Sequence, residues 1–150
     1  MRSFERLSDL QGLVGQEIGV GDWLTVDQPR IDLFAQATGD HQWIHVDARR
    51  AAGGPFGTTV AHGFLTLSLL PVLSASAMEI ADTRMGVNYG LNKVRFIAPV
   101  PVDSRLRAHL VLLAYAPFDA GALLTVRVTI EREGSDKPVC VAESLSRRYI

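Results

Sequence analysis

The feature that most constrains this chain is an uncharged segment, from Val60 to Leu73, that is apolar on every side of the helix it would form. Its apolar side chains are Val60, Ala61, Phe64, Leu65, Leu67, Leu69, Leu70, Val72 and Leu73. A helix that is apolar all round must be covered all round. The segment is shorter than the roughly twenty residues that a bilayer requires. We therefore expect a buried helix at the centre of a folded domain.

A shorter helix is predicted before this segment, over residues 30–38. Its apolar side chains recur at helical spacing, which places them on one face. Pro29 suits the first turn of such a helix, and Gly39 suits the left-handed position that ends it. The helix should therefore stop at Gly39 and leave residues 40–45 as a loop.

Two further residues bound the other helices. Asp47 can cap a short helix over residues 48–52. Pro71 removes one amide donor from the apolar segment, so it should bend that helix or end its best-ordered part.

After residue 85 the hydrophobic period changes to two, which is typical of strands buried on one face. The alternation is regular over residues 106–114 and 124–130, and residues 117–121 supply the turn between them. Three more strands are expected where the alternation is less regular, over residues 86–97, 138–149 and 17–26. The chain thus carries one early strand, then helices, then about four antiparallel strands.

These elements predict a single α+β domain over residues 1–150. The length suits one hydrophobic core, and the chain has no internal repeat or long linker. The sheet has one long apolar helix to cover, so it must curve around that helix. A curved antiparallel sheet wrapped around a central helix is the hot-dog fold.

The charge balance excludes several classes of partner. Fifteen basic and sixteen acidic side chains leave a net charge of −1, so neither nucleic acid nor an anionic membrane is an expected partner. The one cysteine, Cys140, excludes an internal disulfide and is expected to be a small buried apolar residue. The first residues lack the apolar core of a secretory signal, which predicts a cytoplasmic location.

The most informative polar residues are Asp40 and His45, five positions apart at the end of the first helix. Hydration of an enoyl thioester needs a water that is held and deprotonated, and a proton delivered to the α carbon. A carboxylate and an imidazole that share one water can do both near neutral pH. The spacing alone also fits a plainer interpretation, because an Asp after a helix-ending Gly is usually a turn residue. A single His, likewise, is more often structural than catalytic.

The run Ala37–Asp40, followed after four residues by His45, closely resembles the hydratase motif of the MaoC-like dehydratase family. That family includes the R-specific enoyl-CoA hydratases. The similarity continues through residues 56–64 and 88–96. The family often has Asn-Pro inside the motif, where this chain has Gln42-Trp43; the departure affects the loop and leaves the Asp and His in place.

The resemblance implies that Asp40 and His45 form a catalytic dyad in a hydro-lyase. It also implies a homodimer, and a substrate carried on coenzyme A or acyl carrier protein, as in fatty-acid metabolism. Coenzyme A enters only as part of the substrate, and no other cofactor is expected. By analogy with the related hydratases, water should add syn and give the R product.

Gly63 is the next candidate, because it falls in the first turn of the apolar helix. Backbone amides there lack partners within the helix and lie at the positive end of its dipole. An amide in that position can stabilise negative charge on a thioester oxygen. The alternative is a packing glycine where the helix meets the sheet. In similar proteins the His-Gly pair lines the site, so His62 either shapes the pocket wall or caps the helix.

The sequence also allows a metal site and two functions other than hydration. His41, His45 and His62 can be drawn as a zinc site, but a site where a carboxylate and a histidine hold a water accounts better for Asp40, so we predict no metal. The alternative functions are an acyl-CoA thioesterase and a non-catalytic subunit that binds acyl thioesters. The Gly-Asp-x4-His motif favours hydration over hydrolysis, and a subunit that only binds needs neither side chain.

Overall fold

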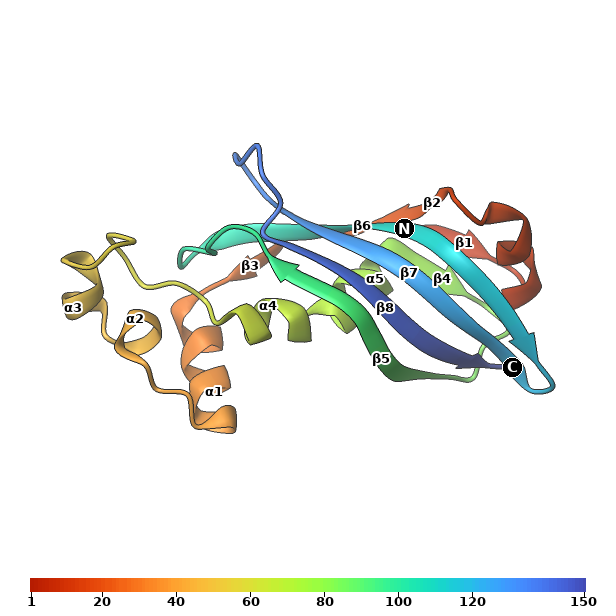
Figure 1. Cartoon of the computed structure of the whole chain (residues 1–150), viewed down its shortest axis with the longest axis horizontal. Helices are drawn as coiled ribbons and strands as arrows, with labels where there is room; N and C mark the ends of the chain where they lie inside the picture. The colour runs from red at the N-terminus through yellow and green to blue at the C-terminus, as the bar shows by residue number, and fades with distance from the viewer.

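The computed structural model describes residues 1–150, and a long curved antiparallel sheet forms its largest part (Figure 1). The strands run in the order β2-β6-β7-β8-β5, and β3 pairs with β6 beside β2. Their bounds are β2 (Glu17–Val20), β3 (Leu24–Val26), β5 (Met85–Phe96), β6 (Ser104–Phe118), β7 (Gly121–Arg132) and β8 (Cys140–Tyr149). The four long strands lie where the sequence predicts them. The predicted early strand is divided into β2 and β3.

Alternation explains the pairing at the centre of the sheet. Leu106, Leu110 and Leu112 on β6 are fully buried, and Leu110 lies opposite Val128 of β7. The two strands turn back at Gly121, whose φ is 156°. A Cβ at this position would lie 1.8 Å from the carbonyl oxygen of Arg148, so only glycine allows β7 and β8 to approach here.

Two consecutive helices, α4 (Gly63–Ser68) and α5 (Leu70–Ala77), form the central apolar segment under the sheet (Figure 1). The division at Leu69 confirms the predicted bend, because the nitrogen of Pro71 cannot continue the helical hydrogen bonds. Leu73 packs in the core at 1% exposed, whereas Phe64 is 69% exposed. The prediction that this segment is covered on all sides is therefore wrong for the single chain, because the sheet covers only one side of it.

Three helices extend beyond one end of the sheet: α1 (Gln28–Thr38), α2 (Trp43–Val46) and α3 (Ala48–Ala52) (Figure 1). Helix α1 ends as predicted, with Gly39 at φ 77° and its amide donating to the carbonyl of Ala35. Asp47 caps α3 as predicted, by accepting a hydrogen bond from the amide of Arg50. The prediction of a loop through residue 45 is wrong in part, since His45 lies within α2.

The N-terminal elements were not predicted from the sequence. Strand β1 (Arg2–Phe4) pairs in parallel with β4 (Met78–Ile80), which directly follows α5. A 3₁₀ helix, η1 (Leu7–Leu13), buries Leu7 and Leu10 in the core.

Cys140 is also fully buried in the core, as predicted, and burial raises the pKa of its thiol to about 11. None of the helices is long and apolar enough to cross a membrane.

Candidate active site

Asp40 and His45 lie together where α1 gives way to α2. Asp40 follows the helix-ending Gly39 and is exposed, whereas His45 is 7% exposed. A carboxylate oxygen of Asp40 and a ring nitrogen of His45 lie within 4.8 Å of each other. Asp40 also makes the local contact expected of a turn residue, since its Oδ1 accepts a hydrogen bond from the amide of Gln42 at 3.3 Å. The two interpretations of Asp40 are therefore compatible.

The separation of the two groups suits a shared water. Two acceptors that each hold one water at about 2.8 Å are separated by about 4.5 Å when the water keeps its tetrahedral angle. The Asp40 carboxylate and the His45 ring, which lie no more than 4.8 Å apart, are close enough for such a water. The arrangement can therefore hold a water between a carboxylate and an imidazole.

The hydrogen bonds of His45 fix which of its nitrogens can accept a proton. Its Nδ1 lies 2.7 Å from the carbonyl oxygen of Val60. A carbonyl can only accept, so Nδ1 carries the hydrogen and Nε2 presents a free lone pair. Burial lowers the pKa of His45, and the nearby His62 lowers it further, while the Val60 carbonyl and the Asp40 charge oppose the shift. The folded protein thus favours neutral His45, which is the form that can act as a base.

His62 lies against His45. Its ring stacks on that of His45, with centroids 3.8 Å apart and planes 24° from parallel. Its Nε2 lies 2.9 Å from the backbone carbonyl oxygen of Asp40 and donates to it. His62 occupies the N-cap position of α4, but its side chain makes no capping hydrogen bond. Of the two predicted alternatives, capping is therefore wrong, and His62 is not among the residues that line the cavity beside His45. Its ring instead contacts the His45 ring and the Asp40 backbone.

Gly63 and His45 line one cavity of about 310 Å³. Gly63 is the first residue of α4, so its amide has no acceptor within the helix. A Cβ on Gly63 would lie 3.0–3.1 Å from ring atoms of Phe96, which lines the same cavity. Gly63 therefore both packs closely against Phe96 and lies beside the cavity.

Gln28 holds the surrounding segments together, although no motif or spacing in the sequence points to it. Its amide nitrogen donates to the backbone carbonyl of His45 and to Asp32, each at 2.8 Å. Its amide oxygen accepts a hydrogen bond from the hydroxyl of Thr59 at 2.6 Å. One side chain in the first turn of α1 thus links α2 to the segment before α4.

The donor atoms of Asp40, His45 and His62 also have the composition of a metal site, because they lie within 4.8 Å of one another. The zinc set considered from the sequence differs from this group, since it contained His41 in place of Asp40. Two nitrogens of the group are already hydrogen-bonded to backbone carbonyls. Each histidine therefore has one nitrogen left for a ligand, and the Nδ1 of His62 is buried without a partner.

The sequence of this chain is similar to those of known proteins over almost its whole length. Residues 9–134 match the family described as "MaoC like domain". Over 148 residues the chain is 54% identical to "3-hydroxyacyl-thioester dehydratase Z" of Mycobacterium tuberculosis (strain ATCC 25618 / H37Rv), with 98% of each chain covered. It is 50% identical over 139 residues to "Nodulation protein N" of Rhizobium meliloti (strain 1021), which covers 91% of this chain and 86% of that protein.

Solved structures confirm the predicted fold. The (R)-hydratase from A. caviae involved in PHA biosynthesis superposes with a TM-score of 0.69 at 22% identity, over 89% of this chain and 94% of that one. A monoamine oxidase regulatory protein from Archaeoglobus fulgius gives a TM-score of 0.75 at 22% identity, over 99% and 97% of the two chains. At this identity the likeness concerns the arrangement of the sheet and helices.

Proposed function

The chain belongs to the MaoC-like dehydratase family, and from this premise we propose that it is a hydro-lyase that interconverts trans-2-enoyl thioesters and 3-hydroxyacyl thioesters. The identity of 54% to a named 3-hydroxyacyl-thioester dehydratase extends over almost the whole of both chains. The observation that carries the proposal is the convergence of Asp40 with a His45 that is held neutral. A carboxylate and a neutral imidazole facing one water are the groups that hydration requires.

In the proposed reaction, Asp40 and His45 hold the water between them. The water oxygen bonds to the β carbon as one of its protons passes to the pair, and the pair returns a proton to the α carbon. The sum is the addition of one water across the double bond, and the dehydration runs through the same steps in reverse. Both transfers come from one side of the substrate, so we propose syn addition, with the R product of the related hydratases.

Gly63 would supply the electrophilic contact in this scheme. Negative charge builds on the thioester oxygen during the reaction, and an oriented amide stabilises it. Gly63 lines the cavity that His45 also lines, and its amide is free of helical hydrogen bonds. The absence of a side chain leaves room for the thioester. One such donor typically stabilises the transition state by about 2.7–4 kcal/mol.

We propose that the reaction needs no metal and no cofactor beyond the carrier of the substrate, coenzyme A or acyl carrier protein. The dyad supplies both proton transfers, and the Gly63 amide supplies the polarising contact. Full activity after extensive dialysis against a chelator is the expected result. Activity that is lost on dialysis and restored by Zn²⁺ would instead assign Asp40, His45 and His62 to a metal. The cytoplasmic location stays a prediction.

We also propose that the enzyme is a homodimer formed along β5. This strand pairs only with β8, so its other edge is unpaired over twelve residues. Five large apolar side chains on it are more than 40% exposed: Met85, Val87, Tyr89, Leu91 and Phe96. A long exposed apolar edge favours pairing with another strand, and a second copy offers the same edge about a twofold axis. Pairing of β5 with its copy would cover both edges.

The test of the proposed activity is spectroscopic. Purified protein is mixed with crotonyl-CoA, and the absorbance of the conjugated thioester is followed together with free thiol. The expected result is rapid loss of absorbance without thiol release, and loss of that activity in Asp40→Asn. Thiol release would identify a thioesterase. Unchanged absorbance with crotonyl-CoA and with longer enoyl chains would indicate a protein that binds acyl thioesters without converting them.

A further inference from the structure

The inner face of β8 changes from apolar to polar along its length. Every second residue of the strand faces the central helix, beginning with the buried Cys140 and Ala142. The next residues on this face are Ser144, Ser146 and Arg148. An inward face of a sheet is normally apolar, because it packs on the core. The irregular alternation over residues 138–149 therefore comes from polar residues at positions that the fold reserves for apolar ones.

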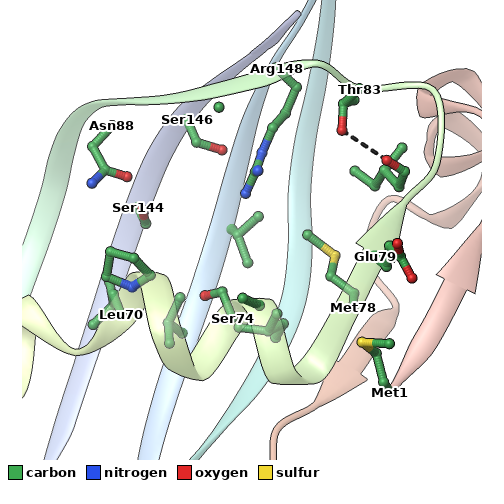
Figure 2. Close-up of a pocket in the computed structure, with 17 residues that line it drawn as sticks. Met1, Leu70, Ser74, Met78, Glu79, Thr83, Asn88, Ser144, Ser146 and Arg148 are labelled. Carbon is green, nitrogen blue, oxygen red and sulfur yellow. Dashed lines mark hydrogen bonds between the residues drawn. The ribbon is translucent and has the colours of Figure 1, made fainter. Parts of the chain in front are cut away.

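These three side chains line a cavity of about 590 Å³ between the sheet and α5 (Figure 2). Small-molecule sites commonly occupy about 300–1,000 Å³. The apolar wall of the cavity is formed by Leu70 and Met78 below the sheet, by Leu110 on β6, and by Val126 and Val128 on β7, the strand beside β8. The cavity shares no lining residue with the one beside His45. It is thus a separate amphipathic space, with an apolar wall beside a polar strand.

Arg148 reaches into this cavity from β8 (Figure 2). Its cross-strand neighbour is Gly86, and a Cβ there would lie 2.6 Å from the Nη1 of Arg148. Gly86 therefore leaves the space that the guanidinium occupies. The preceding residue, Arg147, faces the other side of the sheet and stacks on Tyr89 at 4.4 Å. The two adjacent arginines thus have different environments.

No acidic side chain of the chain lies within ion-pair distance of Arg148, and its guanidinium makes no hydrogen bond within the protein. Its Nε is buried without a partner, and burial lowers the pKa of the group. Glu79 lines the same cavity but is exposed and forms no ion pair with it. Arg148 as a whole is partly exposed. A partly buried charge without a partner lowers the stability of a fold, and such groups are typical of sites where a ligand supplies the counter-charge.

The chemistry of the lining side chains limits which class of ligand this cavity can bind. A guanidinium binds a carboxylate through two parallel hydrogen bonds, and the nearby Ser144, Ser146 and Asn88 can add hydrogen bonds to its oxygens. The apolar wall cannot hydrogen-bond and would cover hydrocarbon. We propose that this cavity binds an aliphatic chain by a carboxylate end, which pairs with Arg148 while the chain lies on the apolar wall.

Two sources can supply such a chain. One is a free fatty carboxylate. The other is the far end of an acyl thioester that carries a second carboxylate, and this source rests on the proposed hydratase function. The chemistry at Arg148 is the same for both, so the first experiment measures binding without catalysis.

The experiment is calorimetric titration of the protein with decanoate below its micelle concentration. Arg148→Met keeps a similar volume and removes the charge, and it should weaken binding by about tenfold or more. Arg147→Gln is the matched control, with the same charge change on the other face, and it should bind as the wild type does. Decanol, which has the chain without the charge, should bind the wild type more weakly than decanoate. Absence of decanoate binding, or equal binding by Arg148→Met, would overturn the proposal.

Two further measurements separate ligand binding from a structural role of Arg148. Arg148→Met should raise the melting temperature, because it removes an unpaired buried charge, whereas loss of a structural contact would lower it. Gly86→Ala retains the arginine but displaces its guanidinium, and it should also weaken decanoate binding. A lower melting temperature in Arg148→Met, together with unchanged binding in Gly86→Ala, would contradict the proposal.

Inhibition kinetics then distinguish the sources. If decanoate inhibits crotonyl-CoA hydration by the wild type but not by Arg148→Met, the cavity receives the acyl chain of the substrate. If decanoate binds without inhibiting, the cavity is a site for a free carboxylate. Both results support binding at Arg148. If crotonyl-CoA is not hydrated at all, the proposed function fails, while the calorimetric result still decides the proposal about the cavity.

Discussion

The imidazole of His62 stacks on that of His45 at a centroid distance of 3.8 Å, and the same ring donates to the backbone carbonyl of Asp40. One residue thus contacts both members of the proposed dyad. Two imidazoles this close do not both carry a positive charge readily. Together with burial, which is the larger effect, this contact keeps His45 neutral near physiological pH.

The first prediction concerns pH. Neutral His45 is the proposed base, and its pKa lies below the ordinary 6.5. The value of kcat/KM should therefore stay constant down to pH 6.5 and fall only when the pH drops further, through the lowered pKa of His45. Between the two values the unfolded chain binds a proton that the folded protein does not, so folding stability should also decline as the pH falls below 6.5. Titration of the His45 ring by NMR checks the shift, and a midpoint above 6.5 would contradict it.

The second prediction concerns the dyad itself. Asp40→Asn and His45→Gln should each lower kcat by roughly 10²–10⁴-fold, which is the usual contribution of a positioned acid or base. The fold should survive, because Asp40 is exposed and Gln retains a donor for the Val60 carbonyl. Steady-state kinetics and circular dichroism on the same samples check both statements. Full activity in either variant would remove that residue from the mechanism.

The third prediction assigns His62 a positioning role. His62→Phe keeps an aromatic ring against His45 but removes the hydrogen bond to the Asp40 carbonyl. We expect kcat/KM to fall by about tenfold, in line with the loss of one hydrogen bond. The acid limb of the pH profile should move up toward 6.5, because His62 is one of the causes that lower the pKa of His45. His41→Phe is the control, since His41 is exposed and lies outside this group; an unshifted pH profile in His62→Phe would refute the role.

The fourth prediction concerns the space at Gly63. The methyl group of Gly63→Ala would lie 3.0–3.1 Å from the Phe96 ring and would intrude on the cavity beside His45. We expect a loss of about 10–100-fold in kcat/KM, comparable to a misplaced contact in the transition state. Adding Phe96→Leu should restore part of the activity if the loss comes from crowding. Gly12→Ala, which meets no atom within 4 Å, serves as the control and should be fully active.

The fifth prediction tests the dimer. A charge on the free edge of β5 should prevent pairing, because it would be buried without a partner. Leu91→Asp should therefore sediment as a monomer, whereas the wild type sediments as a dimer or larger. Leu91 lies opposite Ser144 of β8, which has no charge to pair with the aspartate. Val14→Asp is the matched control, since Val14 is 48% exposed and lies after η1, away from β5. A monomeric wild type at micromolar concentration would exclude the proposed assembly.

The strands and the end of α1 could be predicted because local patterns determine them. Leu106 to Leu112 alternate on one buried face, and Gly39 adopts the left-handed conformation that ends a helix. The pairing of β1 with β4 could not be predicted, because it joins two three-residue strands across more than seventy positions. Such short segments carry no periodicity of their own.

The candidate site was predictable to a similar degree. The spacing of Asp40 and His45 and the family motif pointed to both residues, and the structure brings them together. The stacking of His62 and the hydrogen bonds of Gln28 depend on contacts between distant segments, as with Gln28 and Thr59, which are 31 positions apart. Sequence spacing reports which residues are near along the chain, so it does not report these contacts.

Pairing of β1 with β4 has a practical consequence for handling the protein. This pairing places Met1 in the wall of the 590 Å³ cavity, beside Met78 and Glu79 (Figure 2). An affinity tag fused ahead of Met1 would begin at that wall, and its side chains would have access to the space next to Arg148. Ile150 at the other terminus is 51% exposed and lines no described cavity. A C-terminal tag is therefore the safer purification handle for any titration with decanoate, and an N-terminal one should be cleaved first.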